Sequence, residues 1–416
     1  MFHDYFRFIR RSWPLLLFGM ISVFWGNFGQ SFFISWYGAS FQETLHLSAT
    51  EYGSAYSTAT LASGLLLMWM GAGVDRFPLR WFVTFCAAGL FAATLILSQI
   101  STLTGLIVCL FMLRFFGQGL LPHTAITTMA REFSVHRGKA VSVASIGVPV
   151  GEILLPSFAL MIIAAFGWQK SWLVIGLSIP LIYLPTTLWL LRQSRQEKYR
   201  ESIPTNARKT SPSPKTQGSR RTLLKDLRFW LTLPAILAAP FIVTGIFVHQ
   251  AFILPEMGWT PALFARCFVV YGMAHWLASM YVGALVDRFS GVQLFKFCPV
   301  PMLMGLTACA LAPGPHVAYV LMLLLGASIG SASPIINSLW AEVYGTKHLG
   351  AIRALVSSLA VLSTAASPIL FGILIDRGIS GQGLFLLLSW YLLGAVLLSL
   401  FSFSAKQILT GSTTPH

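Results

Sequence analysis

Long apolar stretches separated by short polar ones run along almost the whole chain. An α-helix rises 1.5 Å per residue, so about 20 apolar residues cross the roughly 30 Å hydrocarbon core of a bilayer. Stretches of about this length occur at residues 13–37, 53–73, 81–100, 104–131, 140–166, 171–191, 229–254, 261–285, 295–312, 317–340, 349–375 and 384–403. The pattern therefore predicts an all-α membrane protein with twelve membrane-spanning helices.

The connection between the sixth and seventh predicted helices differs from the others. Residues 192–228 contain eleven Lys or Arg interspersed with Ser and Pro, a composition that cannot bury an apolar core. We interpret this segment as a flexible, solvated linker rather than as a lipid-binding segment. It divides the chain into an N-terminal six-helix bundle over residues 1–191 and a C-terminal six-helix bundle over residues 229–416.

The two predicted bundles contain the same short motif at equivalent places. The segment from Gly71 to Phe77 recurs from Gly283 to Phe289. The same offset of 212 positions relates Asp75 to Asp287 (287 − 75), Gly138 to Gly350 (350 − 138) and Pro156 to Pro368 (368 − 156). Chance similarity between apolar stretches would not keep three separated segments in one register. The repeat therefore predicts two pseudo-symmetric halves, an arrangement in which a transporter binds its substrate near the midplane between them.

Composition and charge agree with a membrane location. Hydrophobic residues make up 56% of the 416 positions and charged residues only 10%, whereas a soluble domain carries about 25% charged residues. The net charge of +15 lies in the short connections, which points to membrane orientation and not to nucleic acid. Short loops and the absence of Asn-x-Ser/Thr acceptors favour a bacterial inner membrane.

The distribution of Lys and Arg predicts how the chain is oriented. With the N-terminus placed in the cytoplasm, nearly all of the 28 Lys and Arg fall on the cytoplasmic side. The exceptions are Lys170, Arg266 and Arg377, which fall outside, and Arg114, which falls within a helix. An even number of spans then also places the C-terminus in the cytoplasm.

The duplicated motif resembles a known family. Gly71 to Arg80, between the second and third helices, looks like the signature of the major facilitator superfamily, and its second copy follows the eighth helix, as that fold implies. The segment from Arg114 to Gly119 resembles the family's fourth-helix motif, one residue short. The resemblance covers essentially the whole chain, although Phe77 and Pro78 stand where the family usually has glycine. It implies secondary transport by alternating access, with helices 1, 4, 7 and 10 lining the cavity.

The acidic residues of the motif are candidates for a gate on the cytoplasmic side. Asp75 is expected to face the positive end of the helix that begins near Leu349, and Asp287 the helix that begins near Ala140. Ion pairs there would lock the cytoplasmic side and break when it opens; the alternative is that Asp75 and Arg76 only cap helix ends. The candidate gate residues are Asp75, Arg76, Arg131, Glu132, Asp287, Arg288, Glu342 and Arg353.

Two charged side chains lie deep inside predicted helices. Arg114 is roughly 15 Å into the fourth helix, near the centre of the hydrocarbon core, where a fixed cation needs an anion. Glu152 lies roughly 18 Å from the cytoplasmic end of the fifth helix. It is the structural ion-pair partner of Arg114, a proton carrier or neither, and the sequence leaves these possibilities open.

Polar groups on the helices that the resemblance places at the cavity are the substrate-binding candidates. They are Asn27, Gln30, Ser31, Arg114, Gln118, His249, Ser331, Asn337 and Ser338. A lone His or Ser in a membrane helix commonly bonds a neighbouring backbone group, which is the competing interpretation for each. His275, on the eighth helix, is interpreted as structural.

Sequence motifs for other chemistry are missing. The chain has no Gly-x-x-x-x-Gly-Lys-Ser/Thr loop, no His-Glu-x-x-His and no nucleophile elbow, so we expect neither an enzyme nor direct ATP use. The five Cys fall inside apolar stretches and are not spaced as metal ligands, so no metal or cofactor is expected.

These observations predict a monomeric secondary transporter whose partners are a small solute, protons and membrane lipids. Arg114 favours an organic anion such as a monocarboxylate, and Glu152 favours proton symport. The loop from Arg131 to Ala140 also resembles the monocarboxylate and oxalate–formate group of the superfamily. Two alternatives remain open: a proton-driven exporter of lipophilic or cationic compounds, in which Glu152 binds the cation, and a transporter-like sensor that binds a ligand without moving it.

Overall fold

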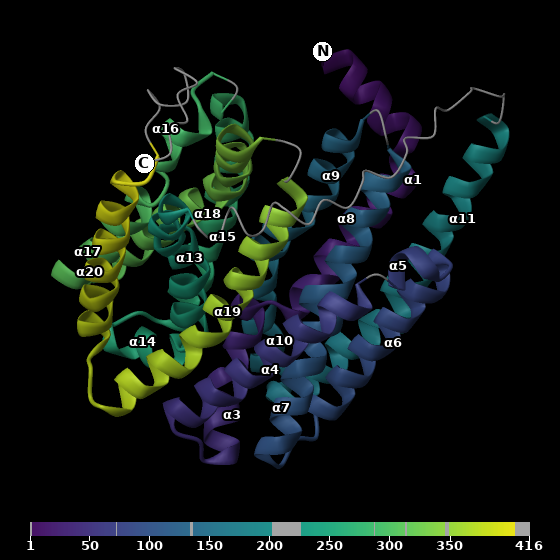
Figure 1. The fold of residues 1–416 in the computed structure, drawn as a ribbon. Coiled ribbons are helices and arrows are strands. Elements are labelled where there is room, and N and C mark those ends of the chain that lie inside the picture. The colour runs from purple at the N-terminus through teal and green to yellow at the C-terminus, as the bar shows by residue number, and fades with distance from the viewer. Residues whose placement is uncertain are drawn as a thin grey trace.

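The computed structural model describes residues 2–71, 73–133, 136–201, 226–286, 288–312, 314–345 and 349–403, without the side chains of residues 2–7, 195–201 and 351. Every regular element within these ranges is a helix, as Figure 1 shows. The all-α prediction is therefore confirmed.

The elements fall into two sets on either side of residues 202–225. The first set is α1 (Phe2–Gly26), η1 (Asn27–Gly29), α2 (Ser31–Ile34), η2 (Ser35–Tyr37), α3 (Gly38–Leu45), α4 (Ala49–Met70), α5 (Gly73–Arg76), α6 (Leu79–Leu97), α7 (Leu103–Met112), η3 (Leu113–Leu120), α8 (Leu121–Glu132), α9 (Arg137–Ser145), α10 (Gly147–Ser178), η4 (Ile179–Tyr183) and α11 (Leu184–Glu201). The second set is α13 (Leu227–Val248), α14 (Gln250–Glu256), α15 (Pro261–Val286), α16 (Gly291–Phe295), α17 (Val300–Leu311), α18 (Pro315–Tyr344), α19 (Leu349–Asp376) and α20 (Gly381–Leu400).

Ten helical stretches in the described ranges are long and apolar enough to cross a membrane, and the bent pair Phe8–Gly29 and Ser31–Leu45 supplies one more. One of the ten, Arg137–Ser194, has 58 residues, or about 87 Å of helix at 1.5 Å per residue. It breaks at Gly167, where φ is +76°, a conformation that glycine adopts without a steric cost. This stretch therefore crosses the membrane twice, which confirms the twelve predicted spans.

The first span is bent by 51° and is not the straight helix that its apolar pattern suggests. The chain leaves helical geometry at Gln30, which is extended, after the short turn η1. The bend lets Gly29 lie directly against η3, where a Cβ atom on this glycine would overlap the carbonyl oxygen of Leu113. Tertiary packing against a neighbouring helix therefore overrides the helical periodicity.

The predicted linker begins inside a helix. α11 continues to Glu201, ten residues beyond the point at which the apolar stretch ends. Its last turns are rich in Arg, Gln, Glu and Lys, which are good helix formers, so loss of hydrophobicity does not end the helix. The remainder of the predicted linker, residues 202–225, lies outside the described residues.

The two halves converge on one side of the molecule and separate toward the other (Figure 1). We call the side where α11 ends and α13 begins the linker side, and the side where α3 and α14 lie the far side. α1 begins and α20 ends on the linker side. On the far side the halves are in direct contact, through α4 against α19 and through aromatic pairs such as Phe32 with Phe268 and Trp36 with Phe264.

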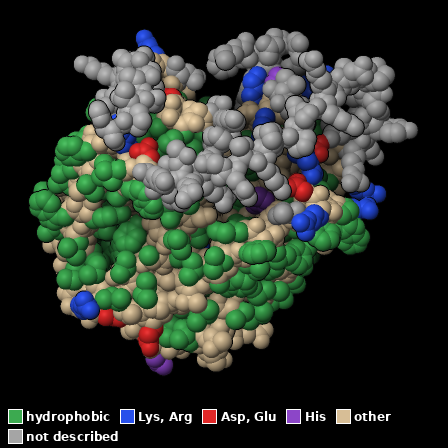
Figure 2. All heavy atoms as spheres, in the orientation of Figure 1, with side chains coloured by type: hydrophobic (Ala, Val, Ile, Leu, Met, Phe, Trp, Pro, Cys, Tyr) green, Lys and Arg blue, Asp and Glu red, His purple; other side chains and the backbone are tan. Residues whose placement is uncertain are grey.

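The outer surface is that of a membrane protein. Figure 2 shows hydrophobic side chains over the flank of the molecule and charged ones gathered toward its ends. Large apolar side chains such as Trp69, Leu181 and Leu311 are more than two-thirds exposed. In water such a surface would aggregate, whereas in a bilayer it faces acyl chains.

The contact between α4 and α19 depends on Gly53. A Cβ atom at this position would overlap the carbonyl oxygen of Pro368, which is backbone and cannot move aside cheaply. We expect Gly53→Ala to destabilise the far-side contact by about 1–3 kcal/mol, the usual cost of overpacking. Thermal unfolding of the purified protein measures this. Gly283→Ala is the matched control because its Cβ would meet no atom within 4 Å, and equal melting temperatures for the two variants would contradict the prediction.

Candidate functional site

Two crevices lie between the halves. The first, the Arg114 crevice, has a volume of about 230 Å³ and lies between α4, η3 and α19. Its polar lining is Thr60, Ser63, Arg114, Gln118 and Thr364. The second, the His275 crevice, has a volume of about 550 Å³ and lies between α9, α10, α15 and α18. Its polar lining is Ser142, Ser145, His275, Ser279, Ser333 and Asn337.

The internal repeat relates these two crevices to each other. The 212-residue offset matches Ser63 with His275 (275 − 63), Gly64 with Trp276 (276 − 64), Gln118 with Gly330 (330 − 118) and Pro149 with Val361 (361 − 149), and each of these lines its own crevice. The crevices therefore occupy equivalent positions in the two halves but differ in their charged and polar side chains: one contains Arg114 and the other His275.

Arg114 is buried, with 3% of its surface exposed. Its Nη1 donates a hydrogen bond to the hydroxyl of Tyr56 at 3.0 Å, and its guanidinium lies 5.1 Å from the centre of the Tyr56 ring. Its Nε, also buried, has no hydrogen-bond partner. No carboxylate in the described part of the chain forms an ion pair with it. The nearest partner of this buried cation is thus a neutral phenol, and its charge is not compensated by the described residues.

The local backbone positions Arg114. It lies in η3, a stretch of π-helix, and π-helical turns occur often at functional sites. A Cβ atom at Gly117, in the same stretch, would come within 2.9 Å of the Gly29 backbone, so only two glycines allow the first and fourth spans to approach so closely. The bend of the first span also places Ser31 beside the Tyr56 hydroxyl.

Glu152 has a partner in the opposite half. The carboxylate on α10 is 4% exposed, and its Oε2 lies 2.7 Å from Nδ1 of His275 on α15. Tyr271, one turn earlier on α15, packs edge-on against the His275 ring at 6.2 Å. Glu152 and His275 therefore connect the halves at the edge of the His275 crevice.

The ion pair between Arg114 and Glu152, left open by the sequence, is not formed in this structure. Each residue bonds a different partner, Tyr56 for the arginine and His275 for the carboxylate. Depth along a helix could not reveal this, because it gives no information about which crevice a side chain enters. In the repeat, Glu152 corresponds to Thr364 (364 − 152), which lines the Arg114 crevice, so the arginine and the carboxylate belong to symmetry-related crevices.

Several other substrate-binding candidates have packing partners. Asn27 donates to the carbonyl of Gly147 at 2.8 Å and ties the first span to the fifth. His249 donates through Nε2 to the carbonyl of Pro368 at 2.7 Å and stacks on Phe371.

Two serines on α18 are likewise engaged. Ser331 donates to the carbonyl of Ser328 at 3.0 Å, and Ser338 donates to Glu342 at 2.6 Å. The structure brings Gln118 to the Arg114 crevice and Asn337 to the His275 crevice, while Gln30 is half-buried at the bend of the first span.

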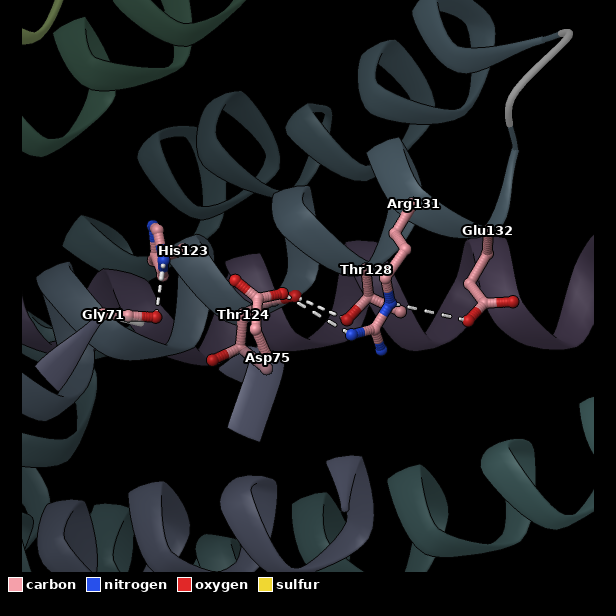
Figure 3. A network of polar contacts seen from close by, with 7 residues as sticks. All are labelled: Gly71, Asp75, His123, Thr124, Thr128, Arg131 and Glu132. Atoms are coloured by element: carbon pink, nitrogen blue, oxygen red, sulfur yellow. Dashed lines mark hydrogen bonds and ion pairs between the residues drawn. The ribbon is translucent and has the colours of Figure 1, made fainter. Parts of the chain in front are cut away.

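The candidate gate residues of the first motif pair within their own half (Figure 3). Asp75 lies 3.6 Å from Nη1 of Arg131, whose Nε is 3.8 Å from Glu132, and the Asp75 side chain is 64% exposed. Nearby, His123 bonds the carbonyl of Gly71 through Nε2 at 3.1 Å. The carboxylate of Asp75 thus faces α8, and not the start of α19 as the sequence suggested. Arg76 is exposed.

The candidate gate residues of the second motif are arranged differently. Glu342 accepts hydrogen bonds from the backbone nitrogens of Gly291 (2.7 Å) and Val292 (3.3 Å), so it holds the start of α16 within its own half. Arg288 and Arg353 are exposed. Asp287 lies outside the described residues.

A far-side contact between the halves was not foreseen from the sequence. Asp376, at the end of α19, accepts hydrogen bonds from the backbone nitrogens of Ala49 (3.2 Å) and Thr50 (2.8 Å) at the start of α4. The start of α4 also carries a capping box formed by Ser48 and Glu51. A carboxylate at a helix N-terminus is stabilised by the helix dipole. Asp376 therefore fastens the C-terminal half to the N-terminal half on the far side.

We expect Asp376→Asn to weaken this contact by about 0.3–1 kcal/mol, because the charge that favours the helix N-terminus is removed. The far side should then open more often. Labelling rates of a cysteine introduced at Ser57, which is buried where α4 meets α19, compared with and without Asp376→Asn, measure this opening. Glu43→Gln, an exposed substitution on the same side, is the control, and an unchanged labelling rate in Asp376→Asn would count against the role.

Sequence reasoning missed the residues that complete the two crevices. Tyr56, Thr60 and Ser63 recur along one face of α4, a spacing that could have marked a polar stripe. His275 was interpreted as structural, although the repeat offset makes it the equivalent of Ser63 in the other half. If the offset of 212 is applied to every polar residue inside a predicted helix, it relates Ser63 to His275 and marks both as candidates.

The fold defines a class of protein: a membrane protein of two helical halves with crevices between them. The family model of the Major Facilitator Superfamily matches residues 16–368. The chain therefore belongs to this superfamily of membrane transporters.

Individual relatives are more distant. The hexuronate transporter of Bacillus subtilis (strain 168) is 25% identical over 226 residues, a match that covers 53% of this chain and only 49% of that protein. Among solved structures, a bacterial homologue of the human lysosomal transporter Spinster, in inward-facing unoccupied and occupied conformations, has a TM-score of 0.68 at 14% identity, covering 98% of this chain and 99% of that one. A mutant of the nucleoside transporter NupG has a TM-score of 0.66 at 14% identity, covering 94% and 100%. These structural matches show the fold.

Proposed function

We propose that the protein carries a small organic anion, such as a monocarboxylate, and couples its movement to protons. The observation that carries the proposal is the buried guanidinium of Arg114, which faces a crevice between the halves and has no anionic partner among the described residues. A buried cation without a counter-charge is costly, and an anionic substrate would supply that charge. The hexuronate named for the relative is itself a sugar carboxylate and belongs to this class.

The polar lining of the Arg114 crevice suits such a ligand. Tyr56 accepts a hydrogen bond from Nη1, and the buried Nε has no hydrogen-bond partner among the described residues, so the guanidinium keeps an unused donor. Arg binds carboxylates through paired N–H donors, which gives orientation as well as charge. Gln118, Thr60 and Ser63 provide neutral donors and acceptors for the rest of the molecule.

The conformation supports a path from the linker side to this crevice. The halves are fastened on the far side by Asp376 and by aromatic contacts, whereas Asp75 pairs within its own half. If the linker side is cytoplasmic, as the distribution of Lys and Arg predicts, this arrangement corresponds to an open cytoplasmic gate and a closed external one. Alternating access would then release Asp376 and engage Asp75 with the opposite half.

Proton coupling is proposed to pass through Glu152. Its carboxylate and the His275 ring join α10 to α15 across the two halves, so protonation of the carboxylate would remove one charge from an inter-half contact. Such a change biases the equilibrium between the two conformations. Tyr271, on α15 itself, is a titratable side chain in contact with this pair.

The experiment is uptake of labelled small monocarboxylates, including a hexuronate, into proteoliposomes with and without an inward proton gradient. Gradient-driven uptake is the expected result. Flux that does not respond to the gradient would contradict proton coupling alone. Absence of carboxylate flux in folded, reconstituted protein would contradict the anion proposal, and flux of lipophilic cations instead would establish the exporter alternative. Carboxylate binding without flux would establish the sensor alternative.

A further inference from the structure

A cavity between helices of the N-terminal half lies apart from the Arg114 and His275 crevices. It has a volume of about 710 Å³ and sits at the linker side of the N-terminal half, between α1, α6, α8 and α11. Leu15, Leu188 and Leu191 form apolar walls, and Arg80 and Arg192 lie at its edge. The cavity therefore combines an apolar interior with a basic rim.

The C-terminal half shows that this space is not an unavoidable feature of the fold. The offset of 212 relates Thr128 to Trp340 (340 − 128), Leu191 to Phe403 (403 − 191) and Arg80 to Val292 (292 − 80). Thr128, Leu191 and Arg80 all line the cavity, whereas Trp340, Phe403 and Val292 are all buried in one apolar cluster of the C-terminal half. The same place is thus filled by two aromatic rings in one half and left hollow, with an arginine at its rim, in the other.

The charges around the cavity select an anion. Of the lining residues, Arg80, Arg131 and Arg192 are basic, and Glu132 is the single acidic one. Asp75 and Glu132 lie 3.6 and 3.8 Å from Arg131 and offset its charge, so the excess positive charge of the lining comes from Arg80 and Arg192. Arginine groups recognise phosphate oxygens through paired N–H donors.

The surroundings place the cavity at a membrane–water boundary. Trp13 on α1 and Trp189 on α11 pack together at 5.8 Å and are partly exposed, and Trp81 on α6 is largely exposed beneath the Arg80 guanidinium. Tryptophan collects at the headgroup level of bilayers. An occupant would therefore have its charged group among the arginines and its apolar part against the leucine walls, toward the acyl chains.

We propose that this cavity binds the headgroup of an anionic glycerophospholipid. The phosphate lies against Arg80 and Arg192, and the first carbons of an acyl chain lie against Leu15, Leu188 and Leu191. Because Arg131 also lines the cavity and is the partner of Asp75, a bound lipid phosphate would share Arg131 with the gate. The site does not depend on which solute the transporter carries.

The test is native mass spectrometry of delipidated protein titrated with phosphatidylglycerol or phosphatidylcholine. Two variants alter the site without touching Arg131: Arg80→Gln with Arg192→Gln removes rim charge, and Thr128→Trp with Leu191→Phe fills the cavity with the residues of the other half. We expect the wild type to bind phosphatidylglycerol roughly tenfold tighter than phosphatidylcholine, and the charge variant to lose about that factor, as expected for two basic residues near an anionic lipid. The filled variant should lose binding of both.

The control is Arg266→Gln with Arg377→Gln, which removes two arginines from the opposite membrane side and should bind like the wild type. Equal binding of the two lipids by the wild type, or full phosphatidylglycerol binding by the charge variant, would overturn the proposal. Displacement of the lipid by millimolar inorganic phosphate would identify a soluble-anion site instead and would also overturn it. If the filled variant does not fold, as judged by gel filtration, the charge variant alone decides.

Discussion

Arg114→Gln is expected to lose carboxylate uptake by at least roughly 30-fold while the protein remains folded. Truncating one member of a buried, hydrogen-bonded charge pair costs about 2–5 kcal/mol, and each 1.4 kcal/mol is about a tenfold change in affinity. The substrate-free protein should not suffer, because a buried cation without a counter-charge contributes no favourable ion pair. Uptake into proteoliposomes and the melting temperature of the substrate-free protein together measure this effect.

Two further substitutions separate a role of Arg114 in substrate binding from a role in protein stability. Arg114→Lys keeps the charge but not the planar fork, so partial uptake is expected. Tyr56→Phe removes the hydroxyl that orients the guanidinium at 3.0 Å and should weaken uptake less than Arg114→Gln does. Arg266→Gln, which alters an exposed arginine bonded to the Ala262 carbonyl, is the matched control. A folded Arg114→Gln protein with wild-type uptake would remove the basis for an anion site.

Glu152→Gln is expected to abolish the response to a proton gradient while exchange of substrate across the membrane continues. The amide resembles the protonated carboxyl in shape and carries no charge, so the contact with His275 no longer changes with protonation. The halves would then still rock, but without a proton to bias them. Counterflow and gradient-driven accumulation, measured on the same proteoliposomes, separate the two activities.

His275→Gln tests the other member of the contact. It leaves the buried carboxylate without its partner across the halves, so we expect slower gradient-driven uptake than in the wild type. Ser279→Ala, one turn along α15 in the same crevice, is the control, because its hydroxyl bonds only the Trp276 carbonyl. If Glu152→Gln loses exchange and accumulation together, the carboxylate has a structural role and the coupling proposal fails.

The sequence by itself determined the membrane class, the twelve spans and the repeated halves. These rest on local or periodic signals: about 20 apolar residues per span, a basic connection in the middle, and motifs kept in one register by a constant offset. The sequence also identified Arg114 and Glu152, because a charge inside an apolar stretch is visible without knowing its neighbours.

Only the tertiary structure decided which side chains meet. The partners of Arg114 and Glu152 come from helices 58 and 123 residues away in the chain, and no local pattern specifies such a contact. The bend of the first span and the continuation of α11 to Glu201 likewise follow from glycine contacts and helix propensity, which hydropathy does not register. Hydropathy and spacing fix which face of a helix is polar, but the rotation and crossing of packed helices determine which crevice that face enters.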